Sequence, residues 1–342
     1  MREGIQQTDP VAATAGERAC RALWLARDLA LSVDTHNVPA PEPGEVRVAV
    51  RWAGVCGSDL HVLRTGEWVR AFPAVLGHEI YGDIDAVGAG VRMAPGTPVV
   101  LDSRLPCFDC DGCRKDPNHC TNLSFLGEAR PGGFSAYCNV PAWLVHPVPE
   151  ELDGSVAVLA EPLAVALHAL SHIDAPRRRA AIIGHGPIGA LIHIELRSAG
   201  CEVDVAEPAP VRAALADGLQ AVVVERGALL TSGGYDLLVD AAGAPGSLTD
   251  AIAAAAVGAT ILVVALDERP VKIVPMQIAE KRLRIVGVNA FIDELPEAIA
   301  RLVAAPQRYR AVVTDSVSLD RLPERLARLL QTPDAVKLLV HI

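Results

Sequence analysis

The sequence has few aromatic residues, with 5 Phe, 4 Tyr and 4 Trp among 342 residues. Aromatic side chains therefore cannot fill most of the interior, and we expect a core built mainly from Ala, Val, Leu and Ile. The sequence also lacks an apolar run approaching the roughly 20 residues that a membrane helix needs. Together these absences favour a globular protein with an aliphatic core and no membrane partner.

Basic charge is also scarce, because 31 Lys and Arg stand against 41 Asp and Glu and give a formal net charge of −10. This balance argues against nucleic acid or an anionic membrane as a partner and fits an acidic enzyme or binding protein. Residues 1–20 lack the hydrophobic stretch of a signal peptide and are expected to form a flexible tail. We therefore expect a cytoplasmic protein, in which disulfides are rare.

The pattern of short apolar runs changes along the chain. From residue 21 to about residue 148, β-like runs such as Val46 to Trp52 are broken by Gly and Pro, which predicts a partly open antiparallel barrel. After Glu161, strand-like runs alternate with helical segments, which predicts a parallel, doubly wound sheet. The chain ends in a strand–helix–strand pattern that we expect to return to the first domain.

A glycine-rich motif lies between the first strand and the first helix of the second region. Gly184, Gly186 and Gly189 form G-x-G-x-x-G, with Pro187 and Ile188 opening the helix. Glycines at these positions allow a tight turn and a close approach of a pyrophosphate, which binds at the helix N-terminus. The motif predicts a dinucleotide site.

The residues after the next strands bear on the choice of dinucleotide. Glu207 ends the second strand, and a carboxylate there can bind both ribose hydroxyls and repel a 2′-phosphate, which favours NAD over NADP. Arg212 could instead pair with a 2′-phosphate or cover the adenine. Leu266, which follows the run Ile261 to Ala265, is assigned to the same cofactor site.

Four of the eight cysteines, Cys107, Cys110, Cys113 and Cys120, have the spacing C-x2-C-x2-C-x6-C. Four thiolates at such spacing can surround one ion tetrahedrally, and a closed four-sulfur site is structural. An iron–sulfur cluster is the alternative. Zinc is favoured because a redox cluster has no evident task beside a nicotinamide.

A second set of metal-binding residue types is spread along the chain. Cys56, His78 and a carboxylate, Glu79 or Glu161, can supply the three protein ligands of a catalytic zinc that keeps one position open. Such an ion lowers the pKa of a substrate hydroxyl and stabilises the alkoxide from which hydride leaves. Ser58 and His61 could then relay the alcohol proton to solvent.

Taken together, these motifs resemble the zinc-dependent medium-chain dehydrogenases, and most closely their polyol branch of sorbitol, idonate and threonine dehydrogenases. The resemblance is carried by Cys56-Gly57-Ser58-Asp59, Gly77-His78-Glu79, the four-cysteine lobe, Gly132-Gly133-Phe134, Glu161-Pro162-Leu163 and Gly184 to Gly189.

The resemblance implies a GroES-like catalytic domain formed by residues 21–163 and 291–342, with a Rossmann domain at residues 164–290. It implies an active site between the domains, catalytic zinc on Cys56 and His78, and Glu79 and Glu161 competing for the third position. It also implies a homodimer or homotetramer, for which the apolar run Ala259 to Ala265 would suit sheet extension. The last gap of the cysteine lobe, six residues where the family usually has seven, is a departure.

The leading hypothesis is therefore an NAD-dependent dehydrogenase of a polyol, sugar or cyclitol. A ketone or aldehyde reductase would use the same site in reverse. A non-catalytic binding protein of this fold is the alternative from another class, and the complete set of metal-binding residues argues against it. The dinucleotide motif argues against a zinc hydrolase. Trp68, Glu128 and Arg130 are expected to line the substrate cleft.

Overall fold

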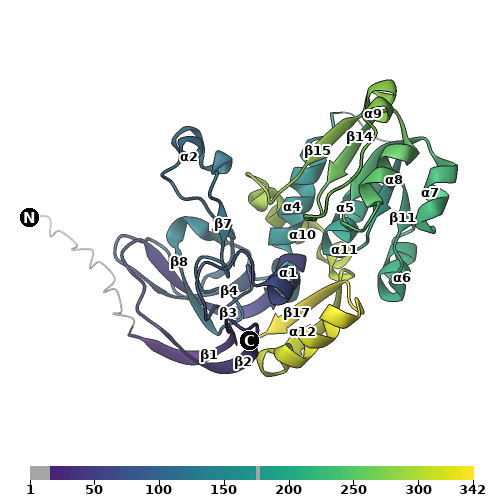
Figure 1. Ribbon diagram of the computed structural model, residues 1–342. Coiled ribbons are helices and arrows are strands. Elements are labelled where there is room, and N and C mark those ends of the chain that lie inside the picture. Colours follow the sequence, from purple (N-terminus) through teal and green to yellow (C-terminus); the bar gives the residue numbers. More distant parts are fainter. Residues whose placement is uncertain (1–15, 175–177) are drawn as a thin grey trace, which may run out of the picture.

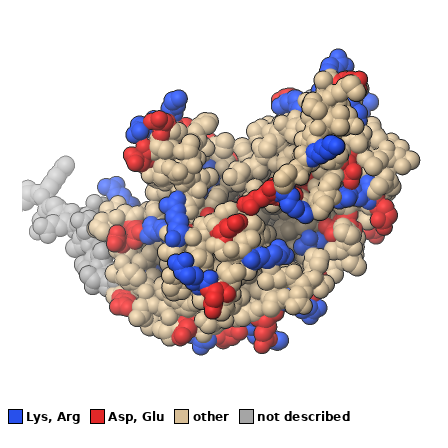
Figure 2. Space-filling view, in the orientation of Figure 1, with Lys and Arg blue, Asp and Glu red and all other residues tan. Residues whose placement is uncertain are grey.

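The computed structural model describes residues 16–174 and 178–342. The described chain forms two lobes, with the N-terminal strands in one and the parallel sheet in the other, and the C-terminal segment returns to the first lobe (Figure 1). In the space-filling view the surface is hollowed between the lobes, and side chains of both charge signs border the hollow (Figure 2).

The first lobe is built on a mainly antiparallel sheet that joins strands from the first half of the chain to the C-terminal segment. Its strand order within the described residues is β16 (Val313–Ser318), β17 (Lys337–His341), β3 (Glu45–Gly54), β4 (Glu79–Val87), β5 (Pro98–Leu101) and β9 (Val145–Pro147), with β8 (Tyr137–Pro141) also pairing with β3. Only β16 and β17 are parallel, and α12 (Leu322–Gln331) connects them. The hairpin of β1 (Arg18–Leu25) and β2 (Leu31–Val38) and the pair β6 (Arg104–Leu105) and β7 (Ser124–Phe125) complete the strands of this lobe. This arrangement confirms the predicted return of the C-terminal strand–helix–strand segment.

The second lobe contains the predicted parallel sheet. Its order in the described residues is β12 (Val222–Val223), β11 (Glu202–Ala206), β10 (Arg179–Ile183), β13 (Tyr235–Asp240), β14 (Ala255–Val263) and β15 (Arg284–Gly287). The chain winds outward in both directions from β10, so the sheet has the doubly wound order whose ligand crevice lies where that order reverses. The glycine motif directly follows β10, and therefore lies at this crevice.

Helices cover the parallel sheet or lie in the connections. They are α1 (Gly57–Thr65), α2 (Asp111–Lys115), α3 (Gly154–Ala157), α4 (Ala160–Ser171), α5 (Pro187–Ser198), α6 (Pro210–Gly218), α7 (Arg226–Ser232), α8 (Ser247–Ala254), α9 (Pro275–Lys281), α10 (Leu295–Ala304) and α11 (Pro306–Arg310), with short 3-10 turns at Pro117–His119, Ala142–Leu144 and Leu319–Arg321. The cores are aliphatic, as the composition predicts: the buried cluster beneath α4 and α5 consists largely of Ala, Val, Leu and Ile.

Two helices lie at or next to the expected domain boundaries, residues 163 and 291, which stay predictions. Helix α4 runs through residue 163 without interruption, and its buried Leu163 and Leu167 belong to the core of the parallel sheet. Helix α10 buries Leu295 and Leu302 in that same core, although residue 291 was expected to start the return. The chain rejoins the antiparallel sheet only at β16.

Two expectations need correction. Strand β1 begins at Arg18, so the last residues of the expected tail are part of a strand, while residues 1–15 lie outside the described part of the chain. The run Ala259 to Ala265 does not offer a free edge, because β14 is hydrogen-bonded to β13 on one side and to β15 on the other. Within the described residues, the edge strands of this sheet are β12 and β15.

One helical stretch in the described residues, Gly154–Ser171, is long and apolar enough by composition to cross a membrane. Its burial explains its composition, since 72% of the stretch lies inside the protein as α3 and α4. It is therefore a core segment of the fold.

Candidate active site

Three predicted metal ligands come together where two connections of the antiparallel sheet meet. Cys56 is the N-cap of α1, His78 directly precedes β4, and Glu79 is the first residue of β4. Their ligand atoms all lie within 4.8 Å of one another. His78 and Glu79 are buried and Cys56 is partly exposed, so the group lies beneath the surface with access at the cysteine.

Asp59 holds the two connections together. Its buried carboxylate accepts hydrogen bonds from the Cys56 amide, at 2.8 Å, and from the Gly77 amide, at 3.3 Å. The bond to Cys56 is the capping bond expected of an acidic residue at the third position of a helix. Asp59 thus fixes Cys56 relative to Gly77, the residue that precedes His78.

The two carboxylate oxygens of Glu79 have different environments. Oε1 accepts a hydrogen bond from Lys337 Nζ at 2.6 Å, whereas Oε2 is buried without a hydrogen-bond partner in the described residues. A Cβ at Gly54 would lie 1.8 Å from this Oε2, so only glycine leaves room for the carboxylate. Burial alone would lower the pKa of Lys337, but the negative charges of Glu79 and Cys56 raise it above its usual value.

Glu161 lies in the first turn of α4, outside the group formed by Cys56, His78 and Glu79. It is buried and accepts a hydrogen bond from Ser103 Oγ at 2.8 Å. Burial raises the pKa of Glu161, while the charge of His78 opposes that rise. The carboxylate is therefore close enough to share the field of the group without being one of its three closest members.

The electrostatics of the group fit a bound cation. Burial would lower the pKa of His78, but Cys56, Asp59 and Glu161 raise it well above its ordinary value. Several anionic side chains therefore surround one imidazole and one lysine, and Glu79 has an orphaned oxygen in addition. Sulfur, imidazole nitrogen and carboxylate oxygen are the ligand types of zinc, so the residues present fit that ion.

Ser58 and His61 follow on α1. Ser58 Oγ is buried without a hydrogen-bond partner among the described residues, so its hydroxyl is available to a ligand. His61 lies one turn further, partly exposed, with Nε2 at 3.1 Å from Glu67 Oε2 and its ring stacked on Trp68 at 4.1 Å between centroids.

The glycine motif has the geometry of a dinucleotide-binding turn. Gly184 has φ +91°, which favours glycine, and a Cβ at Gly189 would lie 2.2 Å from Gly184 O, so the helix packs tightly on the turn. Gly186 is the N-cap of α5 and has open space where a Cβ would be, apart from the Arg212 guanidinium at 3.8 Å. Pro187 and Ile188 form the first turn of α5, whose free amides suit a phosphate.

Glu207 is anchored to this turn. Its Oε2 accepts a hydrogen bond from the His185 amide and its Oε1 one from the Ala209 amide, both at 2.8 Å. Arg212 Nε donates to Ala335 O at 3.1 Å, so this side chain spans from the parallel sheet to the C-terminal segment of the other lobe. Leu266 is 61% exposed in the loop after β14, where an apolar side chain can contact a ligand.

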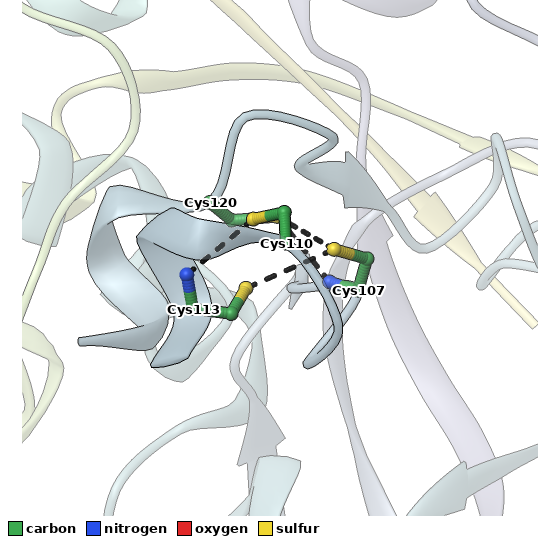
Figure 3. Close-up of side chains that lie close together, drawn as sticks. All are labelled: Cys107, Cys110, Cys113 and Cys120. Atoms are coloured by element: carbon green, nitrogen blue, oxygen red, sulfur yellow. Dashed lines mark hydrogen bonds between the residues drawn. The ribbon is translucent and has the colours of Figure 1, made fainter. Parts of the chain in front are cut away.

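The four-cysteine lobe brings its sulfurs together in spite of the shortened last gap (Figure 3). All four sulfur atoms lie within 4.8 Å of one another, and the 3-10 turn Pro117–His119 takes up the chain between the last two cysteines. Backbone amides point at the sulfurs, with Cys107 N 3.3 Å from Cys120 Sγ and Cys113 N 3.4 Å from Cys110 Sγ.

The protonation tendencies within this lobe oppose one another. A hydrogen bond from the Thr121 side chain lowers the pKa of Cys110 to about 5, whereas burial raises the pKa of Cys113 to about 12. Four sulfurs this close cannot all be thiolates unless a cation compensates their charge, and a zinc ion would do so.

Three side chains were expected to line the cleft, and the structure separates them. Glu128 lies on a turn packed against the backbone before His78, since a Cβ on Gly127 would lie 3.0 Å from Gly77 N. Trp68 covers His61. Arg130 instead pairs with Glu45 and lines a different cavity beside His36 and Cys138, so the expectation for Arg130 was wrong.

Several residues of the site were not predicted from the sequence. Asp59 could have been found from its capping position three residues after Cys56. Lys337, Ser103 and Glu268 carry no local signal, because each reaches the site from a distant part of the chain.

The chain is similar to known proteins along most of its length. Residues 42–150 match the alcohol dehydrogenase GroES-like domain. The starvation-sensing protein RspB of Escherichia coli K12 is 33% identical over 282 residues, which are 79% of this chain and 83% of that protein. The (R,R)-butanediol dehydrogenase of Bacillus subtilis strain 168 is 31% identical over 295 residues, 79% of this chain and 84% of that enzyme. A solved alcohol dehydrogenase (rspB) of E. coli CFT073 in complex with NADH superimposes with a TM-score of 0.87 at 28% identity, covering 95% of this chain and 99% of the other.

Proposed function

Because the chain belongs to the polyol branch of the zinc-dependent medium-chain dehydrogenases, we propose that it oxidises a secondary hydroxyl of a polyol, sugar or cyclitol to a ketone with NAD. The family makes it an alcohol dehydrogenase, and the proposal concerns its substrate class, cofactor and site residues. The observation that carries it is the convergence of Cys56, His78 and Glu79 within 4.8 Å, with the orphaned hydroxyl of Ser58 following on the helix that Cys56 caps.

Cys56, His78 and a carboxylate would hold the catalytic zinc. We assign the third position to Glu79, because it lies within the group, while Glu161 is close enough to replace it or to act through a water molecule. When bound, the metal supplies a Lewis acid for the substrate oxygen, and NAD accepts the hydride.

Side chains of this protein then hold the metal-binding residues in place and transfer the proton of the substrate. Asp59 and Lys337 fix Cys56 and Glu79, respectively, so that the donor atoms keep their spacing. Ser58 Oγ takes the proton of the substrate hydroxyl and passes it toward His61, which is exposed enough to exchange with solvent. In the reductive direction the same groups return the proton.

NAD is supported by the position of Glu207. Its carboxylate is held against the glycine turn by two backbone amides, leaving acceptor capacity on both oxygens for the ribose hydroxyls. The negative charge of Glu207 would repel the 2′-phosphate of NADP. Gly184, Gly186, Gly189, Pro187 and Ile188 would hold the pyrophosphate, with Arg212 and Leu266 at the edges of the site.

The four-cysteine lobe would bind a structural zinc on Cys107, Cys110, Cys113 and Cys120. A reducing compartment such as the cytoplasm would keep these sulfurs available to the metal. For the assembly we propose a homodimer or homotetramer joined at the edge strand β15, where Ile285 is exposed.

The test is metal analysis of the purified protein together with NAD reduction over a panel of polyols, sugars and cyclitols. One zinc per site and turnover on a vicinal diol would support the proposal. A zinc-loaded, NADH-binding protein without turnover on any of these would favour the binding-protein alternative. Ketone reduction that exceeds alcohol oxidation under matched conditions would favour a physiological reductase.

A further inference from the structure

Carboxylates from both lobes lie near His61. Its Nε2 lies 3.1 Å from Glu67 Oε2, and the donor atoms of His61, Glu67 and Glu268 all lie within 4.8 Å of one another. Glu67 follows α1 in the antiparallel lobe, whereas Glu268 lies in the loop after β14 of the parallel sheet. Residues that are distant in sequence and belong to different lobes therefore come together at one imidazole.

The turn after α1 is built to return Glu67 to His61. Gly66 caps the helix with φ +72°, and Thr65 Oγ1 donates to His61 O at 3.0 Å while accepting from the Glu67 amide at 3.1 Å. Trp68 has φ +69°, an uncommon conformation for a large side chain, and its ring stacks on His61 with an interplanar angle of 21°. The backbone thus fixes both neighbours of the imidazole.

Glu268 is positioned by a different set of contacts. Arg269 donates to Asp267 Oδ1 at 2.8 Å and to the carbonyl of Gly243, which ties the loop back to the end of β13. Leu266, the residue we assign to the cofactor, lies in the same loop. The loop that presents Glu268 is therefore part of the proposed cofactor site.

The hydrogen bond between His61 and Glu67 determines which nitrogen of the His61 ring can receive a proton. An ionised carboxylate only accepts hydrogen bonds, so the contact with Glu67 places the proton of neutral His61 on Nε2. Nδ1 then carries the lone pair and is the nitrogen that can accept a proton from the relay.

We propose that Glu67 is a positioning residue and proton acceptor for His61, and that Glu268 from the other lobe shares this role. This rests on the proposed dehydrogenase function. In each oxidation the proton released from the substrate hydroxyl passes through Ser58 to His61 Nδ1, the Nε2 proton leaves to Glu67 and then to water, and exchange with solvent returns the ring to its Nε2–H tautomer before the next turnover. One proton enters and one leaves, while the hydride goes to NAD.

The test compares Glu67→Gln, Glu67→Asp and Glu67→Ala, with Glu280→Gln as an exposed control on α9. Glu67→Gln should lower kcat for alcohol oxidation by roughly 10- to 100-fold, within the range of lost proton-transfer assistance, with KM for NAD within about twofold of wild type. Glu67→Asp should recover part of the rate, and added acetate should accelerate Glu67→Ala alone. A Glu67→Gln kcat within about twofold of wild type would overturn the proposal. A loss of activity in Glu67→Ala that acetate does not reverse would also overturn it.

A double variant measures the contribution of Glu268 to proton transfer. With one carboxylate removed the other can still accept the proton, so Glu67→Gln/Glu268→Gln should lose more activity than the product of the single losses. Strictly multiplicative losses would remove Glu268 from the relay. Inhibition of wild type by added Zn²⁺ that Glu67→Gln escapes, together with unchanged kcat in that variant, would identify a cation site instead.

Failure of the relay is distinguishable from failure of the function. Ser58→Ala serves as the reference, because it blocks the proposed path at its start. If wild type turns over and Ser58→Ala loses activity while Glu67→Gln does not, the inference about Glu67 fails and the dehydrogenase stands. If zinc-loaded wild type has no turnover on the panel, the proposed function itself fails.

Discussion

Lys337 Nζ lies 2.6 Å from Glu79 Oε1, although 258 residues separate the two in the sequence. Both side chains are almost completely buried, and Lys337 also donates to Val55 O at 3.0 Å. The last strand of the chain thereby places a positive charge directly behind the candidate metal ligands. This pair connects the return of the C-terminal segment to the chemistry of the site.

Replacing Lys337 with a neutral residue should destabilise the protein, because the Glu79 carboxylate would then be buried without a compensating charge. Lys337→Met should lower the free energy of unfolding by about 3–5 kcal/mol, the range for breaking one partner of a buried ion pair. Urea unfolding of the zinc-loaded protein measures this, with the exposed Lys272→Met as control. Equal stability of the two variants would mean that the pair contributes nothing.

The assignment of Glu207 predicts a change in cofactor preference. Glu207→Ala removes two charge-assisted hydrogen bonds to the ribose, so KM for NAD should rise by roughly 10- to 100-fold while the NADP to NAD ratio of kcat/KM increases. Steady-state kinetics with both cofactors measure this. Because Glu207 also anchors the His185 amide, Glu207→Gln is the matched variant that keeps much of the shape without the charge. An unchanged preference in both variants would refute the ribose assignment.

Glu128 offers a prediction about the substrate. Burial raises the pKa of its carboxyl, while the charge of His78 and a backbone hydrogen bond at Phe125 oppose that rise. A half-buried carboxylate beside the metal ligands is suited to accept a second hydroxyl of the substrate. Glu128→Gln should therefore raise KM for polyols by about tenfold and leave simple secondary alcohols unaffected, with Glu151→Gln as the exposed control. A uniform effect on both substrate classes would argue against this contact.

How far the sequence predicts this molecule depends on the range of the interactions. The glycine turn, the four-cysteine lobe and the parallel sheet are predictable, because each depends on local spacing or on periodic burial. Lys337 and Glu268 are not, because charged residues in a strand or an exposed loop give no local sign of what lies opposite them in the fold. The expected free edge was placed in β14 for a related reason, since apolar composition identifies a buried strand but not its neighbours.

A buried histidine pair beneath the cofactor turn should make stability fall in mild acid. His185 Nδ1 donates to Arg212 O at 3.2 Å, so its Nε2 accepts from His193 Nδ1 at 3.0 Å, and His193 Nε2 is buried without a partner in the described chain. Burial lowers the pKa of His185 to about 4 and that of His193 to about 3. Both rings are neutral in the folded protein, whereas in the unfolded chain they take up protons below about pH 6.5.

The sign of the effect follows from this difference. The unfolded state binds more protons between pH 6.5 and the folded pKa values, so stability is full above pH 6.5 and declines as the pH falls through that window. Each histidine should contribute a loss of about 2 kcal/mol between pH 7 and pH 5. His193→Leu should be less stable at pH 7, because His185 Nε2 loses its donor, but its stability should fall by about 2 kcal/mol less than that of wild type on going to pH 5. Urea unfolding at both pH values, with the exposed His341→Gln as control, measures the difference. Parallel losses in wild type and His193→Leu would show that His193 is already protonated in the folded protein near pH 5.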